Sequence, residues 1–151
     1  TRHEPVAQPD LDRAMCLLGL GVDDVVGSQW IDNGPGWMGL CLVDAQRVLD
    51  ISKPTGSAQH FDVGVVGLYP QGSDPAIEVR AFFNDPTGSI REDPVTGSLN
   101  ASVGQWLLGV DMLTAPYVAR QTSGLVNVSM SDGQVWVGGR TAVRVSGSIE
   151  L

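Results

Sequence analysis

The chain has 151 residues and a formal net charge of −8, from nine basic and seventeen acidic residues. Hydrophobic residues make up 42% of it, a composition typical of a folded domain rather than a disordered chain. The acidic balance disfavours nucleic acid and anionic membrane as partners, because both select a basic surface. No apolar run approaches the ~20 residues that a membrane helix needs, so no membrane association is expected.

Both cysteines, Cys16 and Cys41, lie in apolar runs and are predicted to be buried, unreactive thiols. Their spacing matches neither a zinc site nor a disulfide framework, so we expect no metal and a cytoplasmic location. The sequence opens without Met and without a signal peptide. This start indicates a piece of a longer protein or a processed product.

Residues 1–8 read as a tail or linker, and the apolar spacing of 9–21 predicts a helix. Asp10 is expected to cap this helix, and Gly19 or Gly21 to end it. Alternating apolar residues and turn residues then predict most of the remaining elements. Strands are expected over 24–31, 37–43 (a hairpin with the first), 62–70, 76–83, 116–122, 125–131, 134–139 and 141–151, and a short helix capped by Asp44 over 44–51.

Residues 95–109 are predicted to form an amphipathic helix that ends at Gly109. Because strands are not in strict alternation with helices, the pattern favours an α+β fold with a largely antiparallel sheet. The apolar stripe of the helix over 95–109 consists of Leu99, Val103, Trp106 and Leu107. The tryptophans are interpreted as core or interface residues: Trp30, Trp37, Trp106 and Trp136.

The tripeptide Thr-Gly-Ser occurs three times, at residues 55–57, 87–89 and 96–98. The first copy precedes a strand, and Pro94 leaves little room for a helix after the second. Both are predicted to be surface turns. The third copy differs, because the helix over 95–109 starts there and its first N–H groups have no partner within the helix.

These free N–H groups favour a carboxylate or phosphate at the third copy. Gly97 lets a ligand approach the backbone, and the Ser98 hydroxyl can cap the helix or donate to the ligand. Glu92 and Asp93 precede the tripeptide, and an acid at this place can transfer protons. An ordinary capped helix with acidic residues before it is the open alternative.

The stretch "EDPVTGS" at 92–98 resembles a motif in the second half of the PhzF-like phenazine-biosynthesis family. Further segments resemble that half in the same order: "WIDNGPGWMGLCLVDAQRVLDI", "FDVGVVGLYP", "IEVRAFF" and "VWVGGRTAVRVSGSIEL". The resemblance implies the diaminopimelate epimerase fold, in which two lobes each wrap a curved, mostly antiparallel sheet around a central helix. Residues 9–151 would then be one such lobe, the C-terminal one, with 95–109 as its central helix.

The resemblance also implies a function, which is isomerisation by proton transfer beside a carboxylate-bearing carbon, without a cofactor. By motif position, Asp93 would be the active-site acid. Gly97 and Ser98 would bind the carboxylate of a small substrate, and Thr96 would shape the loop. The active site would lie in the cleft between the two lobes.

The chain departs from the family pattern in several ways. The family's proton-transferring glutamate and a Gly-His-Pro segment belong to the first lobe, and nothing here matches them. Leu99 replaces a usually small residue and is expected to narrow the space at the helix start, while the connector around 87–89 reads as a loop insertion. Thiol racemisation is disfavoured, because Asp93 stands near where related enzymes carry a cysteine. The residues that lack the family context are His3, His60, Glu4, Glu78 and Glu150.

Two hypotheses follow from the resemblance. In the first, the chain is one lobe of an isomerase, completed by a first lobe from the same parent chain or another subunit. In the second, it is a non-catalytic carboxylate-binding or assembly module, whose apolar flank is covered by a second copy in a homodimer. The motif favours the first hypothesis, and the missing glutamate favours the second.

Overall fold

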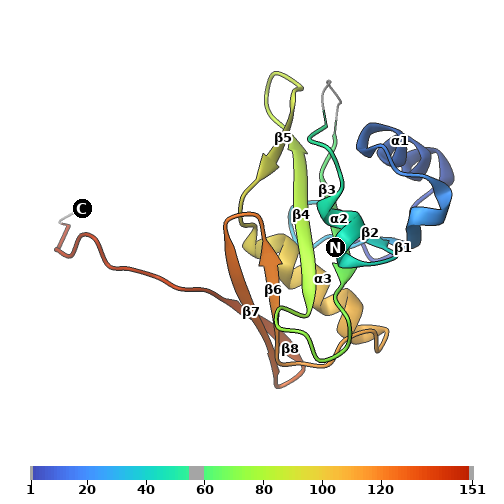
Figure 1. Ribbon diagram of the computed structural model, residues 1–151. Helices are drawn as coiled ribbons and strands as arrows, with labels where there is room; N and C mark the ends of the chain where they lie inside the picture. Colours follow the sequence, from blue (N-terminus) through green and yellow to red (C-terminus); the bar gives the residue numbers. More distant parts are fainter. Residues whose placement is uncertain (1, 55–59, 150–151) are drawn as a thin grey trace.

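A curved sheet of eight strands forms the centre of the computed structural model, which describes residues 2–54 and 60–149 (Figure 1). Its strand order is β1-β2-β3-β4-β6-β7-β8, with β5 added beside β4. Neighbouring strands are antiparallel except in the pairs β2–β3 and β4–β6. The strands are β1 Val25–Trp30, β2 Met38–Leu42, β3 Val63–Leu68, β4 Ile77–Asn84, β5 Ile90–Asp93, β6 Tyr117–Gln121, β7 Gly124–Ser131 and β8 Gln134–Gly138.

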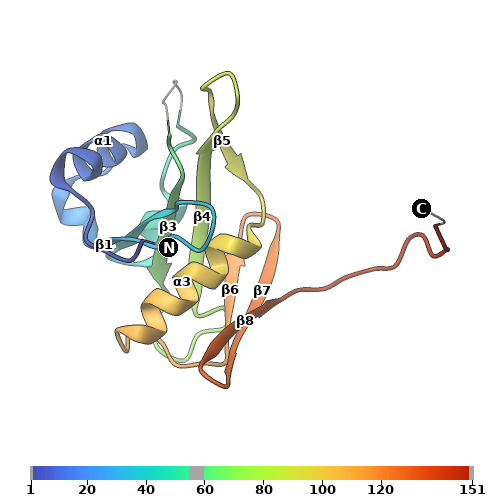
Figure 2. The ribbon, with the colours of Figure 1, turned by 180° about the vertical axis from the view of Figure 1, so that it is seen from behind.

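Helices cover both faces of this sheet, so the chain has two apolar cores. Helix α3 (Gly97–Gly109) lies across one face, as Figure 2 shows, and packs on side chains such as Val79 and Ala119. Helices α1 (Gln8–Leu18) and α2 (Ala45–Leu49) belong to the other side, where Leu40 and Phe82 are fully buried. Alternation along each strand supplies both faces. The predicted α+β class with a mostly antiparallel sheet is confirmed.

Helix α3 is enclosed more completely than its predicted stripe suggested. Leu99, Val103 and Leu107 are fully buried, and Trp106 is nearly so. Leu99 lies directly on the backbone of β3, because a Cβ at Gly64 would overlap the Leu99 side chain. Leu99 therefore fills the core, and the expectation that it narrows the space at the helix start is wrong.

Most predicted elements of the N-terminal half are present. Strands β1 and β2 form the expected hairpin, and the Asp44 carboxylate caps α2 by accepting a hydrogen bond from the Arg47 N–H at 2.7 Å. Gly19 ends α1 in the left-handed conformation. The helix is capped differently at its start, however, because Ala7 is the N-cap residue and Asp10 lies inside the first turn.

The segment expected to be a tail also takes part in the fold. The backbone carbonyls of Glu4 and Arg2 accept hydrogen bonds from the N–H groups of Trp30 and Asp32, at 2.9 and 3.1 Å. The Arg2 guanidinium lies 3.4 Å from the centre of the Trp30 ring. Residues 2–4 thus run beside the end of β1.

Two predictions about strands differ from the structure. Strand β5 was not predicted, although it pairs with β4 and the second Thr-Gly-Ser copy forms the turn between them. Residues 139–149 contain no strand, and they extend away from the sheet with Val143 and Val145 exposed by 86% and 89% (Figure 1). A strand needs a hydrogen-bonding partner as well as alternation, and no described residue supplies one here. The prediction of a strand over 141–151 is therefore wrong for the described residues 141–149.

The predictions for the cysteines and the tryptophans hold only in part. Cys41 is buried, and burial raises the pKa of its thiol to about 11, whereas Cys16 is exposed on α1 and its predicted burial is wrong. Trp37 and Trp106 are buried, but the side chain of Trp136 is 59% exposed.

The first Thr-Gly-Ser copy lies outside the described residues. Within residues 2–54 and 60–149, no helix is long and apolar enough to cross a membrane.

Candidate active site at the start of helix α3

The start of α3 carries the residues that the sequence singled out. Thr96 is the N-cap residue, Gly97 is exposed and Ser98 is half-buried. No described residue accepts a hydrogen bond from the backbone N–H of Gly97 or Ser98. The positive end of the helix dipole therefore presents free donors at an accessible place, which suits an anion.

A groove of about 860 Å³ opens beside Gly97. Apolar side chains form part of its wall, and Val95, Leu125 and Val137 are exposed by 41%, 56% and 36%. Arg140 contributes a positive charge to its lining and Asp74 a negative one. The groove thus combines an apolar wall with helix N–H groups, which fits a small carboxylate with an apolar body.

The turn between β1 and β2 is hydrogen-bonded to the same helix start. Trp37 Nε1–H donates to Ser98 Oγ at 3.2 Å, and Asn33 Nδ2–H donates to the Ser98 carbonyl at 2.9 Å. Because Ser98 Oγ accepts the tryptophan N–H, its own proton is free to be donated elsewhere. The motif "DNGPGW" at 32–37 therefore contributes to the site, a role that sequence analysis did not assign to Trp37.

Asp93 lies at the end of β5 and faces the helix start. The Thr96 hydroxyl donates a hydrogen bond to Asp93 Oδ2 at 2.7 Å. No described residue donates to the other carboxylate oxygen, Oδ1. The four predicted residues, Asp93 and 96–98, therefore form one short segment, in which one oxygen of the acid is hydrogen-bonded and the other has no donor among the described residues.

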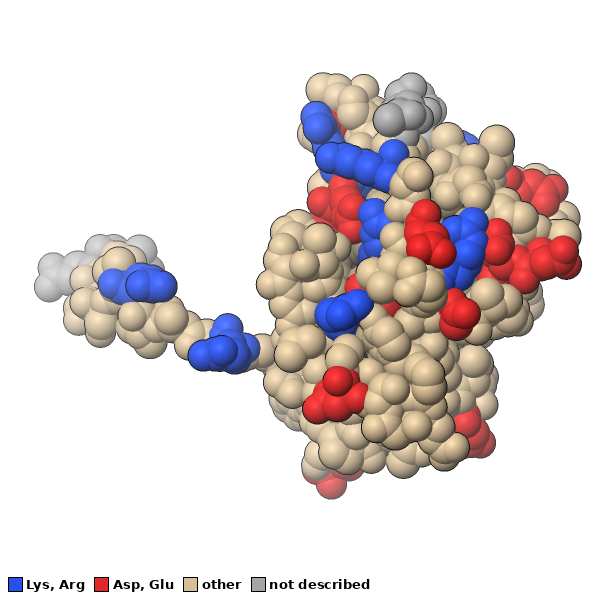
Figure 3. Space-filling view, viewed as in Figure 1, with Lys and Arg blue, Asp and Glu red and all other residues tan. Residues whose placement is uncertain are grey.

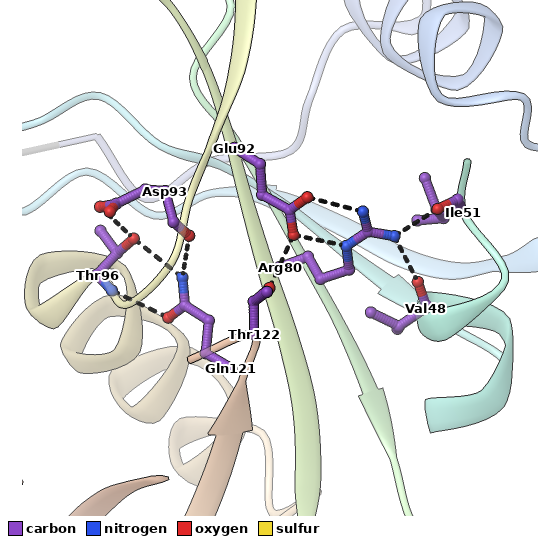
Figure 4. A network of polar contacts seen from close by, with 8 residues as sticks. All are labelled: Val48, Ile51, Arg80, Glu92, Asp93, Thr96, Gln121 and Thr122. Atoms are coloured by element: carbon purple, nitrogen blue, oxygen red, sulfur yellow. Dashed lines mark hydrogen bonds and ion pairs between the residues drawn. The ribbon is translucent and has the colours of Figure 1, made fainter. Parts of the chain in front are cut away.

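Gln121 at the end of β6 links these groups, and sequence analysis missed it. Its side chain is almost fully buried at 1% exposure, and it contacts Asp93 and Thr96 (Figure 4). It also accepts a hydrogen bond from the Asn100 side chain. A signal was available, since Gln121 occupies the same face of its strand as the buried Tyr117 and Ala119. A glutamine at a buried strand position needs polar partners, which identifies it as part of a network.

A second polar network occupies the opposite face of the sheet, as Figure 4 shows. The Arg80 guanidinium donates to both carboxylate oxygens of Glu92, at 2.8 and 2.9 Å, and also to the carbonyls of Val48 and Ile51. The Thr122 hydroxyl donates to Glu92 as well. Hydrogen bonds from Arg80, together with those from Thr122, hold the pKa of Glu92 below its usual value.

Two other residues considered in the sequence, Glu78 and His60, belong to the opposite face of the sheet. Glu78 is buried on the far face and pairs with Arg120 at 2.7 Å. His60 lies near Asp62, next to the end of the undescribed stretch, and Glu150 is outside the described residues. Among residues 2–54 and 60–149, no three His, Cys, Asp or Glu side chains gather as metal ligands would.

Surface charge is mixed on the side seen in Figure 3, which is the side of α2. Basic groups on the body of the domain lie beside acidic ones, so their charges are locally compensated, whereas those on the extended C-terminal segment have no acidic neighbour in this view. This face therefore offers no broad basic area to a polyanion. The closest ion pairs are Arg47–Asp24, Arg80–Glu92, Arg91–Asp85 and Arg120–Glu78.

Comparison with known proteins identifies relatives of the whole segment. A family model described as phenazine biosynthesis-like protein matches residues 3–148. The search of curated proteins finds no match. Among solved structures, a PhzF-family phenazine biosynthesis protein from Enterococcus faecalis is similar, with a TM-score of 0.63 and 22% identity over 92% of this chain and 50% of that one.

Two further structures give the same result. A PhzC/PhzF phenazine biosynthesis protein from Clostridium difficile (strain 630) has a TM-score of 0.59 and 16% identity, over 99% of this chain and 54% of that one. A PhzF-family protein from Bacillus anthracis has a TM-score of 0.59 and 14% identity, over 83% and 49%. At these identities the likeness shows the shared fold, and the chain spans about half the length of each relative.

Proposed function

This chain belongs to the phenazine biosynthesis-like protein family, and from that premise we propose that it forms the carboxylate-binding half of a cofactor-independent isomerase. The observation that carries the proposal is the open start of α3, where free N–H groups lie beside an acid with one unoccupied oxygen. The substrate is a small carboxylic acid. The cytoplasm is the proposed compartment.

Substrate binding follows from the donors at the helix start. The N–H groups of Gly97 and Ser98 and the free proton of the Ser98 hydroxyl together provide donors for one carboxylate. Their partial positive charge favours an anion over a neutral group. The apolar wall with Val95 and Leu125 would then contact the body of the substrate.

Proton transfer is assigned to Asp93. As a carboxylate, its Oδ1 takes a proton from the carbon next to the bound carboxylate, and the C–H electron pair becomes part of the resulting enolate. Asp93 or a second acid then returns a proton at another carbon or on the opposite face. The resemblance to PhzF-like proteins assigns this second group to a glutamate of the first lobe, so we propose that a first lobe or a second copy of the chain completes the site.

The runner-up function is a carboxylate-binding or dimerisation module without catalysis. The exposure of Val95, Leu125 and Val137 beside the groove favours it, because a second copy could cover these side chains in a homodimer. The isomerase and the carboxylate-binding module both require the anion site, whereas dimerisation does not. They differ in whether Asp93 performs chemistry.

Deuterium exchange from solvent into small carboxylic acids tests the proposed isomerase function. NMR shifts of the Gly97 and Ser98 amides measure binding of the same acids. We expect the Asp93→Asn variant to lose exchange and to keep binding. Ser98→Ala should weaken binding roughly tenfold to a hundredfold, the equivalent of one hydrogen bond to a charged group. Ser89→Ala, in the second Thr-Gly-Ser copy, is the matched control and should change neither.

The outcomes separate the two functions. Amide shifts without exchange would favour the binding module. If no carboxylic acid shifts the Gly97 amide, the anion site itself is wrong, and both the isomerase and the carboxylate-binding module fail.

A further inference from the structure

The ends of β5 and β6 meet beside β4 without being paired to each other. Strand β5 pairs with residues 81–84 of β4, and β6 pairs with residues 77–79. One backbone hydrogen bond, from the Ser123 N–H to the Pro94 carbonyl at 3.2 Å, and several side-chain contacts bridge this junction in place of a backbone ladder. On the face of α3 the bridge is Gln121, whose Nε2–H donates to the Asp93 carbonyl at 2.9 Å.

The hydrogen bonds of Gln121 fix the orientation of its carboxamide. Its Oε1 accepts from the Thr96 N–H at 3.0 Å and from Asn100 Nδ2–H at 2.8 Å, and only the oxygen can accept both. Its Nε2 must then face the Asp93 carbonyl and Thr96 Oγ1, the latter at 3.1 Å. The direction of every bond in the network therefore follows from its donors.

This orientation determines where the Thr96 proton points. Because Thr96 Oγ1 accepts a hydrogen bond from Gln121, its own proton is directed to Asp93 Oδ2. Thr96 is 7% exposed and Gln121 is 1% exposed, so the contact between these two side chains is shielded from water. The result is a one-way chain of donors from Gln121 through Thr96 to Asp93.

We infer that Gln121 is a positioning residue for the Asp93 carboxylate, an inference that rests on the function proposed above. Through Thr96 it holds Oδ2 in place and leaves Oδ1 as the oxygen that exchanges a proton with substrate. The same side chain binds the Thr96 N–H at the start of α3. One buried amide therefore sets the distance between the acid and the anion site, which proton transfer requires to be constant.

The test measures the conformation of Asp93 without substrate, by the three-bond Hα–Hβ NMR couplings that report χ1. We expect one rotamer in the unmodified chain and averaged couplings in Gln121→Met and Thr96→Val. Thr96→Ser, which keeps the hydroxyl, should restore the single rotamer. Thr122→Val is the matched control, because Thr122 donates to Glu92 on the opposite face and should leave the Asp93 couplings unchanged.

A single Asp93 rotamer in both Gln121→Met and Thr96→Val overturns the inference. If Gln121→Met does not fold, Thr96→Val decides, because it removes only the hydroxyl through which Gln121 reaches Asp93. Where exchange activity is present, kcat should fall roughly tenfold to a hundredfold in Thr96→Val with little change in KM. The couplings need no activity, so failure of the proposed function and failure of this inference are told apart.

Discussion

Glu92 and Asp93 are neighbours on β5, yet the two faces of the sheet use their carboxylates differently. Glu92 is closed in by Arg80 and Thr122, which donate to both of its oxygens. Asp93 receives one hydrogen bond from Thr96 and keeps Oδ1 open. The acid to which the proposed function assigns proton transfer is thus the one whose hydrogen bonds are incomplete.

The largest effect on stability is expected from Arg80→Met, which removes the guanidinium that is paired with Glu92. The variant leaves Glu92 without its cation and the carbonyls of Val48 and Ile51 without their donor. The side chains of Arg80 and Glu92 are only 12% and 16% exposed, so we expect a loss of about 3 kcal/mol in the free energy of unfolding. Urea unfolding at pH 7 measures it, and a loss no greater than that of Asp93→Asn would contradict the comparison.

Glu92→Gln tests the same pair with a smaller change. The variant keeps the shape but loses the charge-assisted bonds to Arg80, which should cost about 1–2 kcal/mol at pH 7. In the folded chain the pKa of Glu92 lies below the usual 4.5, chiefly because Arg80 donates to its carboxylate. Its stabilisation is therefore present above pH 4.5 and is lost as the pH falls through the folded pKa.

The measurement is urea unfolding of both chains from pH 7 to pH 3. The difference between them should be constant down to about pH 5 and should shrink below it. A difference that stays the same at pH 3 would show that Glu92 is not held as a carboxylate by Arg80.

The variants Thr96→Val and Thr87→Val compare the threonine of the third Thr-Gly-Ser copy with that of the second. Thr96 is buried and exchanges hydrogen bonds with Asp93 and Gln121, so its loss should cost about 1 kcal/mol. Thr87 lies in an exposed turn, where its hydroxyl donates to Asp85, and Thr87→Val should cost less than about 0.5 kcal/mol. Thermal unfolding of the two variants measures this, and equal losses would mean that the buried hydroxyl adds nothing.

These two copies show what local sequence can predict. The copy at 87–89 was recognised as a turn, and the copy at 96–98 as a helix start, from the prolines and the apolar stripe around them. Helix α3 and most strands follow from spacing alone, because apolar period and turn residues are local signals. Asp93, Thr96, Gly97 and Ser98 are contiguous in the chain, so a motif was sufficient to group them.

Gln121 and strand β5 were missed for a different reason. The pairing that brings β5 and β6 together runs through β4, and β6 begins only at Tyr117, after helix α3. The sequence of β5 shows no alternation of apolar and polar residues at its end, because Glu92 and Asp93 are both acidic although their side chains face opposite sides of the sheet. Only the partners, Arg80 on one face and Gln121 on the other, distinguish them.

Asp93→Asn should have the smallest effect on stability, in contrast to Glu92→Gln at the neighbouring position. The asparagine Oδ1 can accept the Thr96 proton as the carboxylate does, and the position is half-buried rather than closed in. We expect a change in the free energy of unfolding within about 0.5 kcal/mol, together with complete loss of proton exchange. Urea unfolding and deuterium exchange on the same sample measure both. A loss of stability equal to that of Glu92→Gln would mean that Asp93 is a structural residue like its neighbour, because an acid kept for chemistry contributes little to the fold that holds it.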